Sequence, residues 1–255
     1  NDAGTTDASD PETTADSTPI ANLLPEEQLE HLRERMVHRD DLRESLIKKC
    51  RDGQKAAKQA IYALHRDDFK KASRLIGVCE KCVLEQLMPI VKEEPMLRHG
   101  SFANVLEEYA EAQLFYAWLK GHASGGDGDG DTQMSDMTTP ATKILLPSDF
   151  TTIPLEPEEY LGGLCDLTGE VGRYAVKRGT LRDDASVKSC LETSMFVLYS
   201  LEGLHRLPGN IGKKMDQLRK SVEKLEKMLY ELSLVKATGR NSIVAGVNDI
   251  EVVDN

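Results

Sequence analysis

The amino-acid sequence predicts an all-α protein with a bundle of about six to seven helices, and three features of the chain support this. Apolar residues recur every three to four positions through most of the chain, which is the period of an amphipathic helix. No stretch of any length alternates apolar and polar residues as a half-buried strand does. Segments that contain Pro or Gly separate the periodic stretches, as is typical of connections between helices.

The expected helices follow from these breaks. The first begins between Leu23 and Glu26 and continues to Leu64, either without interruption or with a kink at Gly53. The second ends or bends at Pro89 and Pro95, because proline cannot donate a backbone hydrogen bond. The second to sixth helices run from about 68 to 91, from 101 to 120, from 158 past 177, from 184 to 205 and from 211 to 234.

The acidic residues are concentrated in segments that have little apolar content. The net charge is −11, yet residues 1–32, 121–140 and 241–255 together hold 15 acids and no Lys or Arg. The rest of the chain has 28 acids against 32 bases, a net charge of about +4 that permits an RNA partner. We therefore predict a disordered acidic tail at 1–20, one all-α domain at 21–240 with a flexible acidic insertion at 121–140, and a disordered tail at 241–255.

The composition also excludes several classes of protein. No run approaches the roughly 20 apolar residues of a membrane span, and no secretory signal is visible, so no membrane partner is expected. Five Cys without paired spacing indicate a reducing compartment, cytoplasmic and/or nuclear, although no basic nuclear-localisation cluster stands out. Cys79 and Cys82 form a lone C-x-x-C, which we interpret as buried thiols rather than a zinc site.

Two stretches carry paired carboxylates in strongly apolar surroundings. Residues 105–115 are apolar nearly all round, yet Glu108 and Glu111 share one helical face. In residues 164–170, Asp166 and Glu170 are four positions apart on another face. Carboxylates are rarely buried unless they are paired or bound to metal. If the two faces meet, the four carboxylates form a candidate site for Mg²⁺ or possibly Mn²⁺, and phosphodiester hydrolysis is the chemistry that suits it.

Other interpretations of these patterns remain open. A glutamate pair at helical spacing is most often a solvated face. The outer face of the helix near 158 is expected to hold Glu159, Gly162, Asp166, Glu170, Arg173 and Lys177. The adjacent Gly162 and Gly163 would suit a close approach by another backbone or a ligand. Glu202 and His205 supply one Glu-x-x-His motif of a di-iron bundle, but no second one follows.

The last predicted helix contains a heptad seam. Its members are Ile211, Met215, Leu218, Val222, Leu225, Leu229 and Leu232. Such a seam packs either inside a helical bundle or against another subunit, and the sequence does not separate these two possibilities.

The two carboxylate stretches resemble the translin family, and more closely its translin-associated factor X (TRAX) branch than translin proper. The resemblance covers roughly residues 25–120 and 143–236 and is most specific at 106–112 and 160–170. It implies a bundle of about seven helices. It also implies that Glu108, Glu111, Asp166 and Glu170 are the acids of a Mg²⁺-dependent endoribonuclease, with Glu111 and Asp166 as the first metal ligands. The adjacent Glu107 is expected to point elsewhere.

The resemblance further implies partners and substrates. TRAX-like subunits assemble with translin subunits into a hetero-oligomer, usually an octamer, that cuts single-stranded RNA such as small-RNA passenger strands or tRNA leader fragments. Arg98 and His99 lie where the family places basic RNA contacts. The alternative is a non-catalytic RNA-binding or structural subunit of a translin-like assembly.

Overall fold

A computed structural model of the chain describes residues 25–124 and 144–238. The tails predicted at 1–20 and 241–255 lie outside these ranges, as does most of the predicted insertion, although residues 121–124 are helical. The chain divides into two compact units, Asn1–Leu42 and Arg43–Asn255. Residues 21–42, which were expected in the main domain, therefore belong to the first unit.

The described part of the first unit is the beginning of helix α1, which as a whole spans Glu26–Leu64. Every residue from 25 to 41 is exposed, including Leu29, Leu32, Met36 and Val37. The expected helix is present here, and its apolar side chains are exposed.

The second unit consists of helices and their connections, and the described residues contain no strand. After α1 come α2 (Phe69–Cys82), a π-helical turn (Val83–Leu87), α3 (Met88–Glu93), α4 (Ser101–Ser124), α5 (Pro157–Thr180), α6 (Asp184–Glu202) and α7 (Gly209–Thr238), with short 3₁₀ turns at Pro95–Arg98 and Pro147–Asp149. The all-α prediction is confirmed. The π-helical turn joins α2 and α3 into one continuous helix. The described residues therefore form six separate helical segments.

Two sequence features that were expected to interrupt helices do not do so. Pro89 lies at the start of α3, directly after the π-helical turn, so the wider turn accommodates the proline and the helix continues. Gly53 does not break α1, because the helix runs through it. A Cβ at position 53 would lie 2.9 Å from Cγ1 of Val105, so this glycine lets α1 pack closely on α4.

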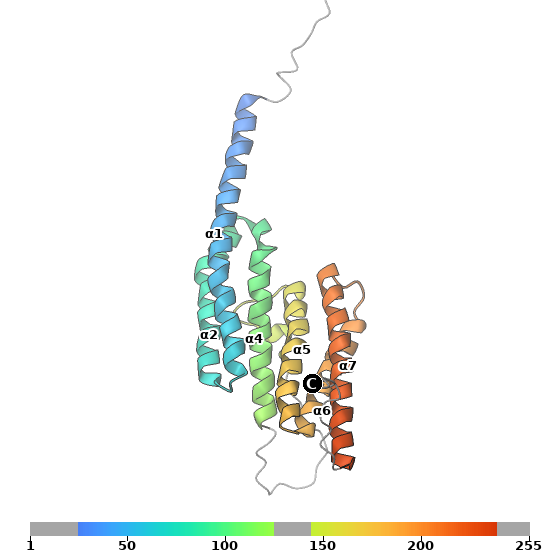
Figure 1. Cartoon of the computed structure of the whole chain (residues 1–255). Helices are drawn as coiled ribbons and strands as arrows, with labels where there is room; N and C mark the ends of the chain where they lie inside the picture. Colours follow the sequence, from blue (N-terminus) through green and yellow to red (C-terminus); the bar gives the residue numbers. More distant parts are fainter. Residues whose placement is uncertain (1–24, 125–143, 239–255) are drawn as a thin grey trace, which may run out of the picture. The chain divides into compact units, whose positions relative to one another are not determined.

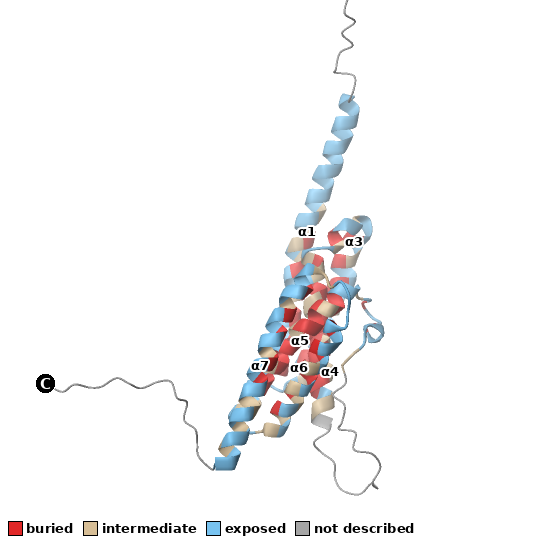
Figure 2. Ribbon diagram, turned by 90° about the vertical axis from the view of Figure 1, so that its right-hand side faces the viewer, coloured by how far each residue is buried: buried red, intermediate tan, exposed pale blue. Residues whose placement is uncertain are grey.

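Helix α4 is the centre of the second unit. It lies side by side with α5, which in turn packs on α6 and α7, and buried residues concentrate along these helices (Figures 1 and 2). Four of its large side chains, Phe102, Tyr109, Phe115 and Trp118, are at most 1 % exposed. The indole of Trp118 donates to the hydroxyl of Thr193 on α6 at 3.1 Å, which satisfies its polar atom inside the core.

The heptad seam packs within the chain over most of its length. Ile211, Met215, Leu218, Val222 and Leu225 are all buried, and α7 contacts α5 and α6. Of the two interpretations left open by the sequence, bundle packing therefore accounts for this part of the seam.

Helices α4 and α5 approach each other most closely at Gly162 and Gly163. A Cβ at position 163 would lie 2.6 Å from Cβ of Ala110, 2.9 Å from the carbonyl oxygen of Glu107 and 3.0 Å from the amide nitrogen of Glu111. The expectation that another backbone comes close at this glycine pair is confirmed at Gly163, whereas at Gly162 the close neighbour is the side chain of Glu107. This crossing turns the carboxylate faces of the two helices toward each other.

Candidate functional site

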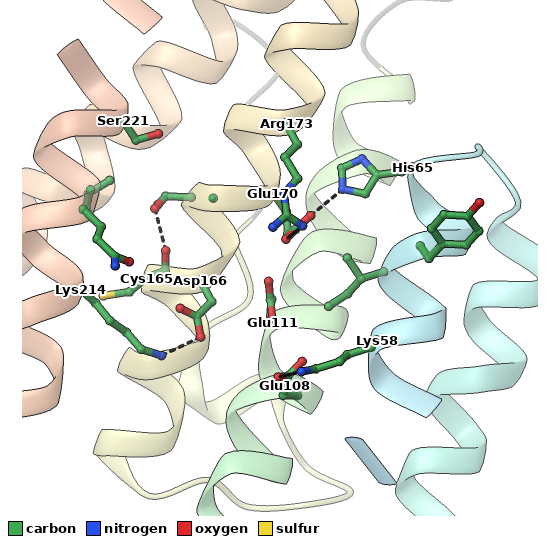
Figure 3. Close-up of a pocket in the computed structure, with 16 residues that line it drawn as sticks. Lys58, His65, Glu108, Glu111, Cys165, Asp166, Glu170, Arg173, Lys214 and Ser221 are labelled. Atoms are coloured by element: carbon green, nitrogen blue, oxygen red, sulfur yellow. Dashed lines mark hydrogen bonds and ion pairs between the residues drawn. The ribbon is translucent and has the colours of Figure 1, made fainter. Parts of the chain in front are cut away.

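The four predicted carboxylates line one pocket of about 590 Å³ in the second unit (Figure 3). Glu108 and Glu111 come from consecutive turns of α4, and Asp166 and Glu170 come from consecutive turns of α5. Helix α1 contributes Lys58 and the turn after it contributes His65, and α7 contributes Lys214 and Ser221. The two faces that the sequence singled out therefore do meet.

Glu111 is the most perturbed acid of the pocket. It is 7 % exposed and lies between the other labelled carboxylates (Figure 3). Burial, followed by the negative charges of Glu170, Asp166 and Glu108, raises its pKa to about 9. A carboxyl group in this setting holds its proton at neutral pH unless a cation lies beside it.

Basic side chains surround the other three acids. Nζ of Lys58 lies 2.9 Å from Oε1 of Glu108, and Nζ of Lys214 donates to Asp166 at 2.6 Å. Nε2 of His65 and Nη1 of Arg173 each lie 2.6 Å from a different oxygen of Glu170. Burial alone would raise the pKa of Glu170, but the hydrogen bond to His65 and the charge of Arg173 outweigh it and hold this pKa below its usual value.

Lys214 links the pocket to Glu107. Its Nζ donates to Glu107 at 2.7 Å, to Asp166 at 2.6 Å and to the carbonyl of Gly162 at 3.3 Å. Glu107 does not line the pocket, in agreement with the expectation that it points elsewhere. It nevertheless shares a lysine with Asp166, which the sequence did not indicate.

The donor set suits a hard divalent cation, but its present arrangement does not enclose one. Four carboxylates around one pocket, one of them with a strongly raised pKa, are oxygen ligands of the type that Mg²⁺ and Mn²⁺ prefer. Within the described ranges, no group of three or more His, Cys, Asp or Glu side chains has the geometry to hold a metal ion. Lys58, Arg173 and Lys214 instead supply the positive charge and His65 supplies a hydrogen bond, so a cation would have to compete with them.

The structure places Arg98 and His99 elsewhere. Arg98 makes a paired hydrogen bond to the buried carboxylate of Glu159, at 3.1 and 2.8 Å, and a further bond to the carbonyl of Pro154. His99 is exposed, and neither residue lines the carboxylate pocket. Their role as RNA contacts stays a prediction.

The prediction that the outer face of α5 is exposed is wrong for three of its residues. Glu159, Gly162 and Glu170 are buried, because this face packs against α4 and the pocket rather than facing solvent. Arg98 accounts for the buried Glu159, which also accepts the backbone N–H of Glu156 at the start of the helix.

The basic residues of the pocket were missed. Arg173 was noted only as an outer-face residue at helical spacing from Glu170. Lys58, His65 and Lys214 are distant in sequence from the acids that they contact, so no local pattern indicates them. Lys58 lies on α1 and His65 directly follows its last residue, Leu64, so the sequence shows that the two are near each other along the chain but not that both face the acids.

The di-iron interpretation loses its motif. Helix α6 ends at Glu202, so Glu202 and His205 do not lie on consecutive turns of one helix. Glu202 instead pairs with Arg219 of α7 at 3.0 Å.

In the described part of the chain, no helix is both long and apolar enough to cross a membrane.

The sequence is similar to those of known proteins. The family model described as the translin family matches residues 41–236. Translin-associated protein X of Mus musculus is 26 % identical over 218 residues, covering 77 % of this chain and 74 % of the relative. The homologue from Schizosaccharomyces pombe is 24 % identical over 225 residues, covering 78 % and 84 %.

Solved structures show the same fold at lower sequence identity. Apo-NeC3PO superposes with a TM-score of 0.64 at 18 % identity, covering 82 % of this chain and 98 % of that one. AfC3PO bound to duplex RNA superposes with a TM-score of 0.60 at 19 % identity, covering 83 % and 99 %. From the family match over most of its length, we conclude that this chain belongs to the translin family.

Proposed function

We propose that the chain is the catalytic subunit of a metal-dependent endoribonuclease that cleaves single-stranded RNA within a hetero-oligomer of translin-like subunits. The observation that carries this proposal is the meeting of Glu108, Glu111, Asp166 and Glu170 around one pocket. A core carboxyl group with a pKa of about 9 is an unfavourable choice for structure alone, because an apolar side chain would fill the same space at less cost.

Glu111 and Asp166, completed by Glu108 and Glu170, would hold Mg²⁺ or possibly Mn²⁺. When bound, such an ion neutralises charge on a scissile phosphate and increases the acidity of a water molecule. Glu111 would give up its proton on binding the cation, since a nearby positive charge favours the carboxylate form. Lys58 and Lys214 would then be free to attract the phosphate backbone, while His65 keeps Glu170 oriented.

Partners and compartment follow from other parts of the chain. Exposed aromatic side chains on α6 and α7, namely Phe196, Tyr199 and Tyr230, favour contacts with further subunits. The C3PO structures support an association with RNA, since one of them contains a duplex RNA. Five buried free cysteines favour a reducing compartment, the cytoplasm or the nucleus.

The test is cleavage of a labelled single-stranded RNA by the chain co-expressed with a translin subunit. Wild type, Asp166→Asn and the control Asp216→Asn are each assayed with Mg²⁺ and with EDTA. Asp216 is an exposed aspartate of α7 that pairs only with Arg219 among the described ion pairs and does not line the pocket. We expect Asp166→Asn and EDTA to abolish cleavage, while Asp216→Asn cleaves like wild type and all three proteins have the same helical content by circular dichroism.

A non-catalytic RNA-binding subunit is the second candidate, and the ion pairs of the pocket favour it. Each acid except Glu111 already has a basic partner, as in a purely structural network. RNA binding without cleavage in every sample would establish this alternative and refute the nuclease.

A further inference from the structure

We propose that one face of α1 binds single-stranded RNA and leads it into the carboxylate pocket. This face, which we call the α1 strip, consists of Arg51, Lys55, Lys58 and Tyr62. Their spacing of three and four residues places all four on one side of the helix, and Arg66 follows in the turn after α1. The inference rests on the proposed function, because it assigns the path of that enzyme's substrate.

The strip is hollowed and continuous with the pocket. An open depression of about 460 Å³ is lined by Arg51, Gln54, Lys55, Lys58, Gln59 and Tyr62. Lys58 and Tyr62 also line the carboxylate pocket, so the two spaces share a wall. A ligand that lies along the depression therefore reaches the four acids without crossing another element.

The charge of the depression suits a polyanion. Its lining includes three cations, two amides, one phenol and no carboxylate. Arg51 and Lys55 are exposed, and the ion pairs of the described residues include neither of them. Lys58 stands at the junction, where it pairs with Glu108. The positive charge thus lies along the approach, and the negative charge lies at its end, where a phosphate would meet a bound cation.

Tyr62 gives the strip an aromatic surface. Its side chain is 60 % exposed, so one face of the ring is open to a ligand that lies along the row of cations. Nη1 of Arg66 donates to its hydroxyl at 3.2 Å, and the guanidinium lies 5.5 Å from the ring centroid. These contacts hold the ring at the rim of the pocket, where an unstacked base can pack on it.

Single-stranded RNA is the occupant that these features favour. Nonspecific single-strand sites combine a basic groove with aromatic side chains on which bases stack, and a base inside a duplex cannot stack in this way. From Arg51 to Tyr62 the helix rises about 16 Å, at about 1.5 Å per residue, which is long enough to contact several successive phosphates.

The test is binding of a fluorescent oligouridine to the full-length chain in EDTA, measured by anisotropy over a range of salt concentrations. We compare wild type with Arg51→Ala/Lys55→Ala and with Lys224→Ala/Lys227→Ala. The control pair is exposed on α7 and lines neither the depression nor the pocket. Two lost phosphate contacts should lower the slope of log K against log salt by about 1.4 and weaken binding about tenfold at 0.15 M salt.

Variants of Tyr62 test base stacking independently of charge, because the side chain is aromatic and uncharged. We expect Tyr62→Ala to weaken binding at least about fivefold without a change in salt slope, and Tyr62→Phe to bind within about twofold of wild type. Duplex RNA should be insensitive to Tyr62→Ala. Equal losses for both forms of RNA would overturn the assignment to single strands.

The proposal of an RNA-binding strip and the proposal of a nuclease can be refuted independently, because RNA binding is measured without metal. If the Arg51/Lys55 variant binds like wild type while Asp166→Asn still abolishes cleavage, the strip is refuted and the enzyme stands. If the wild-type protein cleaves nothing but the strip variants lose binding as expected, the strip stands and the nuclease is refuted.

Discussion

Gly163 provides a direct test of how packing builds the site. In a Gly163→Ala variant, the new Cβ would lie 2.6 Å from Cβ of Ala110 and about as close to the backbone of Glu107 and Glu111. None of these atoms is the end of a flexible side chain, so α4 and α5 must move apart. Overpacking of this kind lowers the free energy of unfolding by about 3 kcal/mol. The better helix propensity of alanine raises it by about 1 kcal/mol.

We therefore expect Gly163→Ala to lower the free energy of unfolding by about 2 kcal/mol. For a domain of this size, that corresponds to a decrease in Tm of about 4–8 °C. The control is Gly77→Ala on α2, where a Cβ would meet no atom within 4 Å. We expect that variant to be as stable as wild type or up to about 1 kcal/mol more stable.

Thermal and urea unfolding, each followed by circular dichroism, would measure both variants. If Gly163→Ala proved as stable as Gly77→Ala, the close crossing of α4 and α5 would be refuted, and with it the geometric basis of the pocket.

Three further predictions concern the chemistry of buried groups. Because the pKa of Glu111 is about 9 when folded and near 4.5 when unfolded, the folded state holds an extra proton between these values. Metal-free stability should thus fall by up to about 1.4 kcal/mol per pH unit from pH 5 to 8, and urea unfolding of Glu111→Gln should show a flatter profile. Replacing Lys214 by Met should remove a competitor for Asp166, so Mg²⁺ should raise the Tm of Lys214→Met more than that of wild type; an equal rise would contradict this. Burial raises the pKa of the Cys79 and Cys190 thiols to about 12, so both should react with iodoacetamide only after unfolding, as peptide mass spectrometry would show.

The sequence predicted the helices, and the meeting of the two carboxylate faces, because both depend on local patterns. The period of apolar residues marks each helix, and Glu108 with Glu111 is unusual within a single apolar stretch. The glycine pair at 162 and 163 even indicated where two backbones approach each other. These features depend on residues that are close together along the chain, so they can be recognised in the sequence alone.

The errors arise where the outcome depends on distant partners. Glu159 was placed on a solvated face because nothing near it in sequence neutralises it, whereas Arg98 does so from the turn before α4. Pro89 was expected to end the second helix or bend its last turn; the helix continues through it, with a π-helical turn directly before it. The seam of α7 could not be assigned, since bundle and subunit interfaces use the same apolar side chains.

The distribution of charge around the pocket has a functional consequence. Four acids in one cavity repel each other, and the structure relieves this repulsion in two ways, by ion pairs to Lys58, Arg173 and Lys214 with a hydrogen bond to His65, and by a raised pKa at Glu111. Both forms of relief are reversible: a bound divalent cation would replace the proton and would weaken the hold of the acids on the lysines. A released lysine beside a bound cation is an additional contact for a phosphate. Cation and RNA should therefore bind cooperatively at this site, each making the binding of the other more favourable, whereas a purely structural network would show no such coupling.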